Sequence, residues 1–173
     1  MTRARDLAAG TFEQATGGVL KLETSDTTVT DGSVLGKIEF KAPDEASGTD
    51  AILVGAAIEA VAEGTFAADN NATELVFKTG ASAAADAKMT LDSSGNLLVG
   101  TTDNNVADNS GTSNNGFNVR SSGRVLIAEP ENAGLWVNRL GNDGDIAVFR
   151  KDGTTVGSIG TDSSSGDFYV QSQ

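Results

Sequence analysis

The stretch Met89-Thr-Leu-Asp-Ser-Ser-Gly-Asn-Leu-Leu-Val99 returns without gaps, 28 residues further on, as Phe117-Asn-Val-Arg-Ser-Ser-Gly-Arg-Val-Leu-Ile127. Apolar residues match at five positions and the central Ser-Ser-Gly is identical, while Ser164-Ser-Gly-Asp-Phe-Tyr-Val170 is a partial third copy. Two short apolar runs around a glycine turn predict a β-hairpin. So small a unit cannot bury its apolar face alone, so it must stack on neighbouring units or other chains. The alternative is that turns of unrelated hairpins converge on such sequences.

The remaining chain is also divided into short apolar runs by frequent turn residues, including 21 Gly but only 2 Pro. This pattern predicts an all-β protein. Asp152-Gly153, a preferred tight-turn pair, predicts a hairpin between two of the runs. The predicted strands outside the repeat are 18–22, 35–40, 74–78, 146–150, 154–159 and 168–170.

Two segments allow more than one interpretation. In residues 52–62 every even position is apolar, as in a half-buried strand, although the alanine content also suits a helix. The glycines at 48, 55 and 64 favour the strand. Residues 81–88 fit either one or two helical turns or a loop.

The polar stretch 101–116, in which only Val106 and Ala107 are apolar, predicts a long loop or linker. We therefore expect an N-terminal anchoring segment (1–18), a β-rich domain (19–100), this linker (101–116) and a second β-hairpin domain (117–173).

The composition excludes several classes of function. The chain has no Cys and no His, which removes disulfides, thiolate chemistry, Cys-type zinc sites and the Ser-His-Asp triad. Its net charge of −12 and its scattered basic residues argue against nucleic-acid binding. It has neither a long apolar run nor a signal-peptide core, so we expect no membrane insertion.

Leu, Ile, Val and Phe make up about 23% of the 173 residues, close to the ~20% below which charged chains stay disordered. One chain alone therefore has little material for a core. Short hairpins also leave open strand edges that must be paired, covered or closed by symmetry. We expect a trimeric fibre or knob with β-packing between chains.

Candidate chemical sites have simpler structural explanations. Glu59 with Glu63, or Asp143 with Asp145, could form the paired carboxylates of a glycosidase, but a solvated charged face or a turn is the favoured explanation. Residues 142–145 resemble a calcium loop only faintly, and Asx-turn chemistry accounts for them. The stretch 32–37 lacks the spacing of a phosphate loop. We predict no catalytic, cofactor or metal residues.

Aromatic residues near the C-terminus offer a possible contact surface. Trp136 and Tyr169 could stack on a glycan or a partner, but packing within or between chains is the favoured explanation, as it is for Phe149 and Phe168. Arg3 and Arg5 could anchor the chain to an acidic surface, or could belong to a frayed terminus.

The first copy of the repeat, with its flanking residues, resembles a known group of proteins. Lys88-Met-Thr-Leu-Asp-Ser-Ser-Gly-Asn-Leu-Leu-Val-Gly-Thr-Thr102 is similar to a segment of tail-fibre and related virion proteins of marine and freshwater bacteriophages. Residues 20–28, 34–40 and 58–63 look like the elements that lead into it, and 135–160 resembles another recurring fibre segment. The opening residues 1–8 are similar to N-termini of cyanophage and marine-phage structural proteins.

The resemblance implies a homotrimeric β-fibre on the phage particle, made in the host bacterial cytoplasm and held to other virion proteins through its N-terminus. The expected function is that of a tail fibre that contributes to adhesion, with host surface glycan as a possible partner. Many such fibres end in a self-cleaving chaperone domain, whereas this chain ends at Gln173. Either that domain has been removed, or the chain is a short complete protein such as a capsid-bound head fibre or decoration protein. A glycan-degrading tailspike fragment is a distant alternative.

Overall fold

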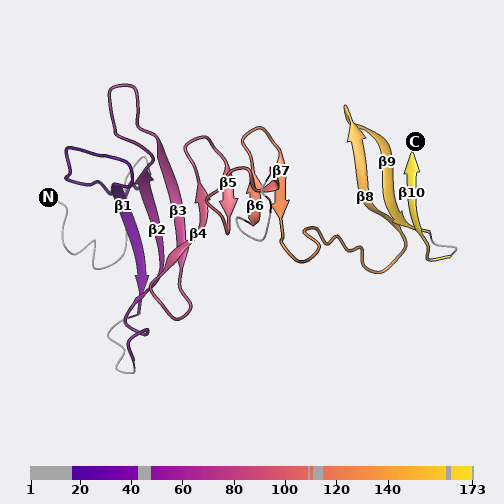
Figure 1. The fold of residues 1–173 in the computed structure, drawn as a ribbon, viewed down its shortest axis with the longest axis horizontal. Helices are drawn as coiled ribbons and strands as arrows, with labels where there is room; N and C mark the ends of the chain where they lie inside the picture. The colour runs from indigo at the N-terminus through magenta and orange to yellow at the C-terminus, as the bar shows by residue number, and fades with distance from the viewer. Residues whose placement is uncertain (1–16, 43–47, 109, 111–114, 163–164, 173) are drawn as a thin grey trace. The chain divides into compact units, whose positions relative to one another are not determined.

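The computed structural model describes residues 17–42, 48–108, 110, 115–162 and 165–172, and almost all of its regular structure is β. It divides into two units, Met1–Pro130 and Glu131–Gln173 (Figure 1). The all-β prediction is confirmed. The division falls after Pro130, whereas the sequence pattern placed a boundary in 101–116, a segment that lies within the first unit.

The first unit contains a seven-stranded antiparallel sheet whose strands follow one another in chain order, so that every connection joins neighbours. Turn residues separate the apolar runs, so the strands end after three to nine residues. The elements are β1 (Val34–Lys41), β2 (Val54–Ala62), β3 (Thr73–Thr79), β4 (Asp86–Leu91), β5 (Leu97–Val99), the 3₁₀-helix η1 (Val106–Asp108), β6 (Gly116–Val119) and β7 (Val125–Ala128).

The two copies of the repeat form the hairpins β4–β5 and β6–β7, as predicted. Their turns share one geometry, in which Gly95 and Gly123 donate their N–H groups to the carbonyls of Asp92 and Arg120, at 3.0 and 2.8 Å. Both glycines have positive φ, 80° and 85°, which is why the repeat keeps Gly at this place.

The hairpins lie side by side because β5 pairs with β6. Asn96, which is buried, connects their turns: its side chain donates to Asp92 (2.8 Å) and accepts from the backbone N–H of Ser121 (3.0 Å). The two repeat units therefore pair edge to edge within one sheet, which satisfies a strand edge of each but leaves their apolar face exposed.

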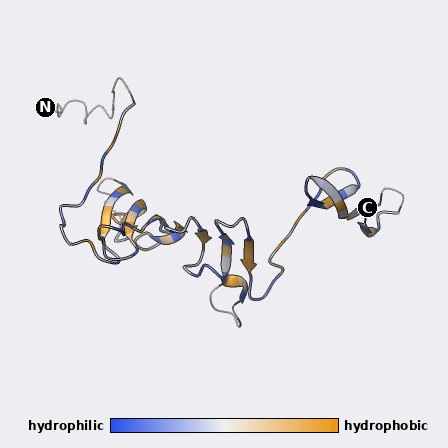
Figure 2. Ribbon diagram, turned by 90° about the horizontal axis from the view of Figure 1, so that it is seen from above, coloured by the Kyte–Doolittle hydropathy of each residue, from blue (hydrophilic) through white to orange (hydrophobic). Residues whose placement is uncertain are grey.

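One face of the seven-stranded sheet carries two neighbouring rows of paired residues that contain no polar side chain. We call this the apolar face. The first row is Ile38, Ile58, Phe77, Met89, Val99, Phe117 and Ile127, and the second is Gly36, Ala60, Leu75, Leu91, Leu97, Val119 and Val125. In Figure 2, orange, hydrophobic residues lie along these strands.

The opposite face, the covered face, carries the buried row of the unit. This row crosses six strands as Glu59, Val76, Thr90, Leu98, Asn118 and Leu126, and all but the last are buried. The segment 101–108 lies over part of it, where η1 packs on β6 and β7 with Val106 fully buried. Asn118 donates to the carbonyl of Asp103 at 2.6 Å, and Arg120 donates to the carbonyl of Asn104 at 2.8 Å.

The second unit is a three-stranded antiparallel sheet in the order β10-β9-β8. Its strands are β8 (Gly144–Lys151), β9 (Thr154–Thr161) and β10 (Phe168–Ser172). Asp152 and Gly153 both have positive φ, 49° and 79°, as a type I′ hairpin turn requires, so the predicted hairpin is confirmed.

Three local expectations are corrected or resolved. The prediction of a strand at 18–22 is wrong. These residues pair with no described strand, and Val19, Leu20 and Leu22 are exposed. Residues 81–84 form a bend and 86–88 already belong to β4, so there is no helical turn. Residues 54–62 are a strand, as favoured, although Ala57 and Glu59 are buried while the even positions Ile58 and Ala60 lie on the apolar face.

Candidate functional site

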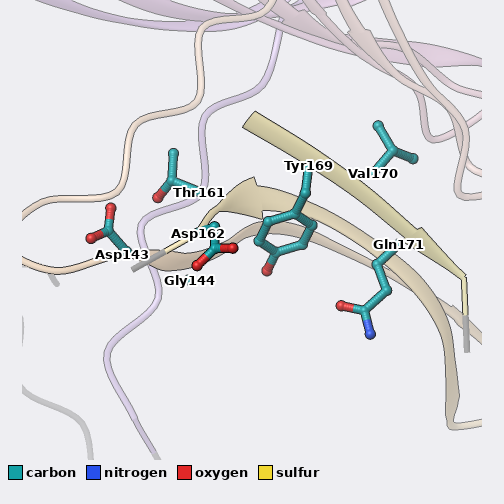
Figure 3. Close-up of a pocket in the computed structure, with 7 residues that line it drawn as sticks. All are labelled: Asp143, Gly144, Thr161, Asp162, Tyr169, Val170 and Gln171. Carbon is teal, nitrogen blue, oxygen red and sulfur yellow. The ribbon is translucent and has the colours of Figure 1, made fainter. Parts of the chain in front are cut away.

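A hollow in the second unit surrounds Tyr169 on β10 and has a cavity volume of about 570 Å³. Tyr169 and Gln171 point to one side of β10 and Val170 to the other, as side chains alternate along a strand (Figure 3). The lining residues are Asp143, Gly144, Thr161, Asp162, Tyr169, Val170 and Gln171.

Tyr169 is held in place by a hydrogen bond across the sheet. Its hydroxyl donates to Oδ1 of Asp145 on β8 at 2.5 Å. Hydrogen bonds from Ser158 and Tyr169 lower the pKa of Asp145. The same bond to Asp145, together with some burial, raises the pKa of Tyr169 above 10.0. The hydroxyl is therefore committed to an internal contact, and the ring lies half-buried at the edge of the hollow.

Gly160 makes this cross-strand contact possible. It pairs with Asp145 on one side and with Tyr169 on the other, so the tyrosine side chain must pass over it. A Cβ atom at position 160 would lie 2.8 Å from the Tyr169 hydroxyl and closer still to the carbonyl oxygen of Gly144. Only a glycine fits there, a requirement that becomes visible once the strands are paired.

The turn 142–145 resembles a calcium loop in sequence. Its oxygens accept hydrogen bonds from a side chain of the same unit. Arg139 donates through Nε to the carbonyl of Asn142 (2.9 Å), through Nη2 to its Oδ1 (2.9 Å) and through Nη1 to the carbonyl of Asp145 (3.1 Å). A guanidinium thus satisfies the oxygens that a cation would need. Across the described part of the chain, no group of three or more acidic side chains could hold a metal ion.

The side chains that line the hollow can form hydrogen bonds with a ligand. Asp143 and Asp162 supply carboxylates, Thr161 a hydroxyl, Gln171 an amide and Tyr169 an aromatic edge. Carboxylate, amide and aromatic groups together suit a polyhydroxylated ligand. Sequence reasoning identified Tyr169 but missed Asp162 and Gln171, because only the pairing of β9 with β10 brings them to one place.

The other sequence candidates lie apart from this hollow. Trp136 is 84% exposed in the segment before β8, where its indole N–H donates to the carbonyl of Ala133 at 3.0 Å. It is not among the residues that line the hollow. Arg3 and Arg5 lie outside the described residues.

Glu59 and Glu63 do not face a common cleft. Glu59 is buried and forms ion pairs with Lys37 (3.1 Å) and Lys78 (2.7 Å). Burial raises its pKa, but the hydrogen bonds from Lys78 and Lys37 outweigh this, so the pKa lies below 4.5. Glu63 instead accepts the backbone N–H of Ser93 at 2.9 Å.

Glu63 also borders a smaller acidic hollow of about 210 Å³ on the first unit, together with Glu74 and Asp92. Burial, followed by the charges of Glu63, Asp92 and Asp31, raises the pKa of Glu74. This arrangement concentrates negative charge, and among the described residues that line the hollow no cation balances it.

No protein-family model, curated protein or solved structure was found to match this chain. Within the described residues, no helix has the length and apolar character needed to cross a membrane. The class of protein that these observations define is a β-sheet protein whose two units carry exposed apolar side chains.

Proposed function

We propose that this protein is a structural component of a bacteriophage particle, a short fibre of the tail-fibre type built from three copies of the chain. It projects from the particle surface and contributes to adhesion to the host. Its role is mechanical and adhesive rather than catalytic.

The observation that carries this proposal is the distribution of apolar side chains in the single chain. The buried apolar residues among those described are few and mostly small: Ala57, Ala62, Val76, Leu98 and Val106. By contrast, 22 large apolar residues in the described part of the chain are exposed, with Trp136, Leu140 and Val170 above 70%. A soluble monomer seldom leaves so much apolar surface in water. A protein that works as an assembly of several chains accounts for it.

Outer strands that pair with no further strand among the described residues support the same proposal. β1 and β7 are the outer strands of the seven-stranded sheet, and β8 and β10 those of the three-stranded sheet. β1 carries charges that discourage random pairing, whereas β7 is Val-Leu-Ile-Ala without a charge. Symmetric assembly is a common way to protect such an edge.

Attachment and adhesion are assigned to different ends of the chain. We propose that the N-terminal segment, with Arg3 and Arg5, binds an acidic surface of another virion protein. The aromatic residues Trp136 and Tyr169 are proposed to contact host glycan. The exposed indole and the polar groups around Tyr169 support this assignment.

Imaging the intact phage particle with a label on this chain tests the proposal. Label on tail-associated projections is expected. Label on the head would show that the protein is a head fibre or decoration protein and not a tail fibre. Particles without label would overturn the proposed virion role altogether. Incubation with host surface polysaccharide should release no new reducing ends; their appearance would show a glycan-degrading enzyme.

A further inference from the structure

We propose that the apolar face of the seven-stranded sheet is the surface through which copies of this chain associate, each copy turning this face toward the shared axis. The inference rests on the multimeric state proposed above and names the surface that produces it.

The two faces of the sheet are inverted relative to those of an ordinary soluble domain. Antiparallel sheets usually bury the apolar face and leave the polar face in water. Here the covered face buries the polar Glu59, Thr90 and Asn118 beside Val76 and Leu98. The apolar face, which has no polar side chain in its two rows, leaves Ile38, Leu75 and Val125 between 40% and 56% exposed. The chain therefore covers the wrong face for a monomer.

The apolar face is also continuous. Its fourteen positions hold thirteen apolar side chains and one glycine, and each residue is paired with the next across the sheet. Leu22 lies against Gly36 at the β1 end. From β2 to β7 the exposed members are 36–56% accessible: Leu75, Leu91, Val99, Phe117, Val125 and Ile127.

The size of this face lies near the lower limit for a stable interface. Seven strands about 4.8 Å apart and two rows about 6.7 Å apart give roughly 450 Å² of flat area per chain, before side-chain relief is added. Two such faces bring together roughly 900 Å² of flat area, and the relief of their side chains raises the buried surface toward the ~1,200 Å² lower end of a standard interface.

The charge distribution identifies a second copy as the occupant. The chain carries a net charge of −12, so two copies repel one another over most surfaces. The two rows of the apolar face contain no charged side chain, so copies meet there without bringing like charges together. Flat apolar sheets also pack face to face at about 10 Å.

The absence of cysteine allows a direct test with single-cysteine variants of the full chain. Phe117→Cys places a thiol on the apolar face. Ala107→Cys, on the exposed side of η1 over the covered face, is the matched control. On mild oxidation, Phe117→Cys should give disulfide-linked dimers and Ala107→Cys should not. Maleimide labelling of the Phe117→Cys thiol should slow about tenfold on assembly, because it then requires local opening.

A second measurement needs no variant. Met89 lies on the apolar face, so its oxidation by peroxide should be slower in the assembled chain than in a dilute, dissociated sample. Equal oxidation rates in a sample that sedimentation shows to be assembled would overturn the proposed interface.

The outcomes separate this inference from the proposed function. A chain that is monomeric at micromolar concentration overturns the interface and the trimer together. An assembled chain in which only Ala107→Cys cross-links overturns the interface alone. Cross-linking through Phe117→Cys in a protein that is absent from particles upholds the interface and overturns the virion role.

Discussion

Tyr169 on β10 donates its hydroxyl to Asp145 on β8 at 2.5 Å, across the intervening strand β9. The bond joins the two edge strands of the three-stranded sheet, which do not pair with each other. From the sequence, these residues are candidates for separate sites, Tyr169 for a glycan contact and Asp145 for a carboxylate pair. In the structure they form one contact. Their hydrogen bond fixes the position of Tyr169, which lines the hollow together with Asp143 and Asp162.

Replacing Tyr169 by Phe removes this bond while keeping the ring. The pKa of Asp145, lowered by Ser158 and Tyr169, should rise toward its ordinary value of 3.8, and NMR titration of the Asp145 carboxyl group measures this. If the Asp145 titration is the same in both proteins, the bond does not exist in solution.

The same pair predicts how stability of the second unit depends on pH. Because the pKa of Asp145 is lowered, its stabilisation is fully present above 3.8 and is lost as pH falls through the folded value. Because the pKa of Tyr169 is raised, its stabilisation is present below 10.0 and is lost as pH rises further. Tyr169→Phe should weaken both dependences, as followed by thermal unfolding across pH.

Gly160→Ala should destabilise the second unit by about 2 kcal/mol, because the new methyl group overlaps the Gly144 carbonyl and the Tyr169 hydroxyl. Denaturant unfolding measures the change. Gly55→Ala on β2 is the control, since its Cβ would make only an ordinary contact, 3.6 Å from the Phe40 carbonyl. Equal effects of the two variants would show that space over Gly160 is not limiting.

Arg139→Ala should loosen the turn 142–145, which loses three hydrogen bonds. Amide hydrogen exchange should become faster in this turn and remain unchanged in β2. Since Arg139 already satisfies these oxygens, calcium or EDTA should not shift the melting temperature of the unaltered protein. A calcium-dependent rise would restore the calcium-loop interpretation.

Glu59→Gln should cost about 2 kcal/mol, because it removes the buried partner of Lys37 and Lys78. Since the pKa of Glu59 is lowered, its contribution is complete above pH 4.5 and is lost as pH falls through the folded value. Glu39→Gln, on the exposed side of the same network, should change stability by less than about 0.5 kcal/mol. A larger loss in Glu39→Gln than in Glu59→Gln would contradict this.

Asn96→Ala should cost about 1–2 kcal/mol, because it leaves the Ser121 N–H unpaired between the two hairpins. Arg124 occupies the matching place in the second copy but is exposed, so Arg124→Ala should change stability by less than about 0.5 kcal/mol. Urea unfolding of the two variants gives the comparison. Similar losses would mean that the hairpins do not depend on this contact.

Local patterns predicted the hairpins well, because a tight turn depends on neighbouring residues. Asp152-Gly153 and the two Ser-Ser-Gly turns need positive φ at glycine, and the glycine in each turn indicates this requirement in the sequence. The strand at 18–22 failed for the opposite reason. An apolar run becomes a strand only when another strand pairs with it, and none does so here among the described residues.

Composition and local pattern were thus enough for the all-β class, most strands and the shortage of core-forming residues. Composition and local pattern could not determine the register between strands. That register alone aligns Ile38 through Ile127 into an uncharged row, turns Glu59 to the covered face and carries Tyr169 over Gly160 to Asp145. Which side chains share a face depends on contacts between residues far apart in the chain, and those contacts exist only once the sheet has formed.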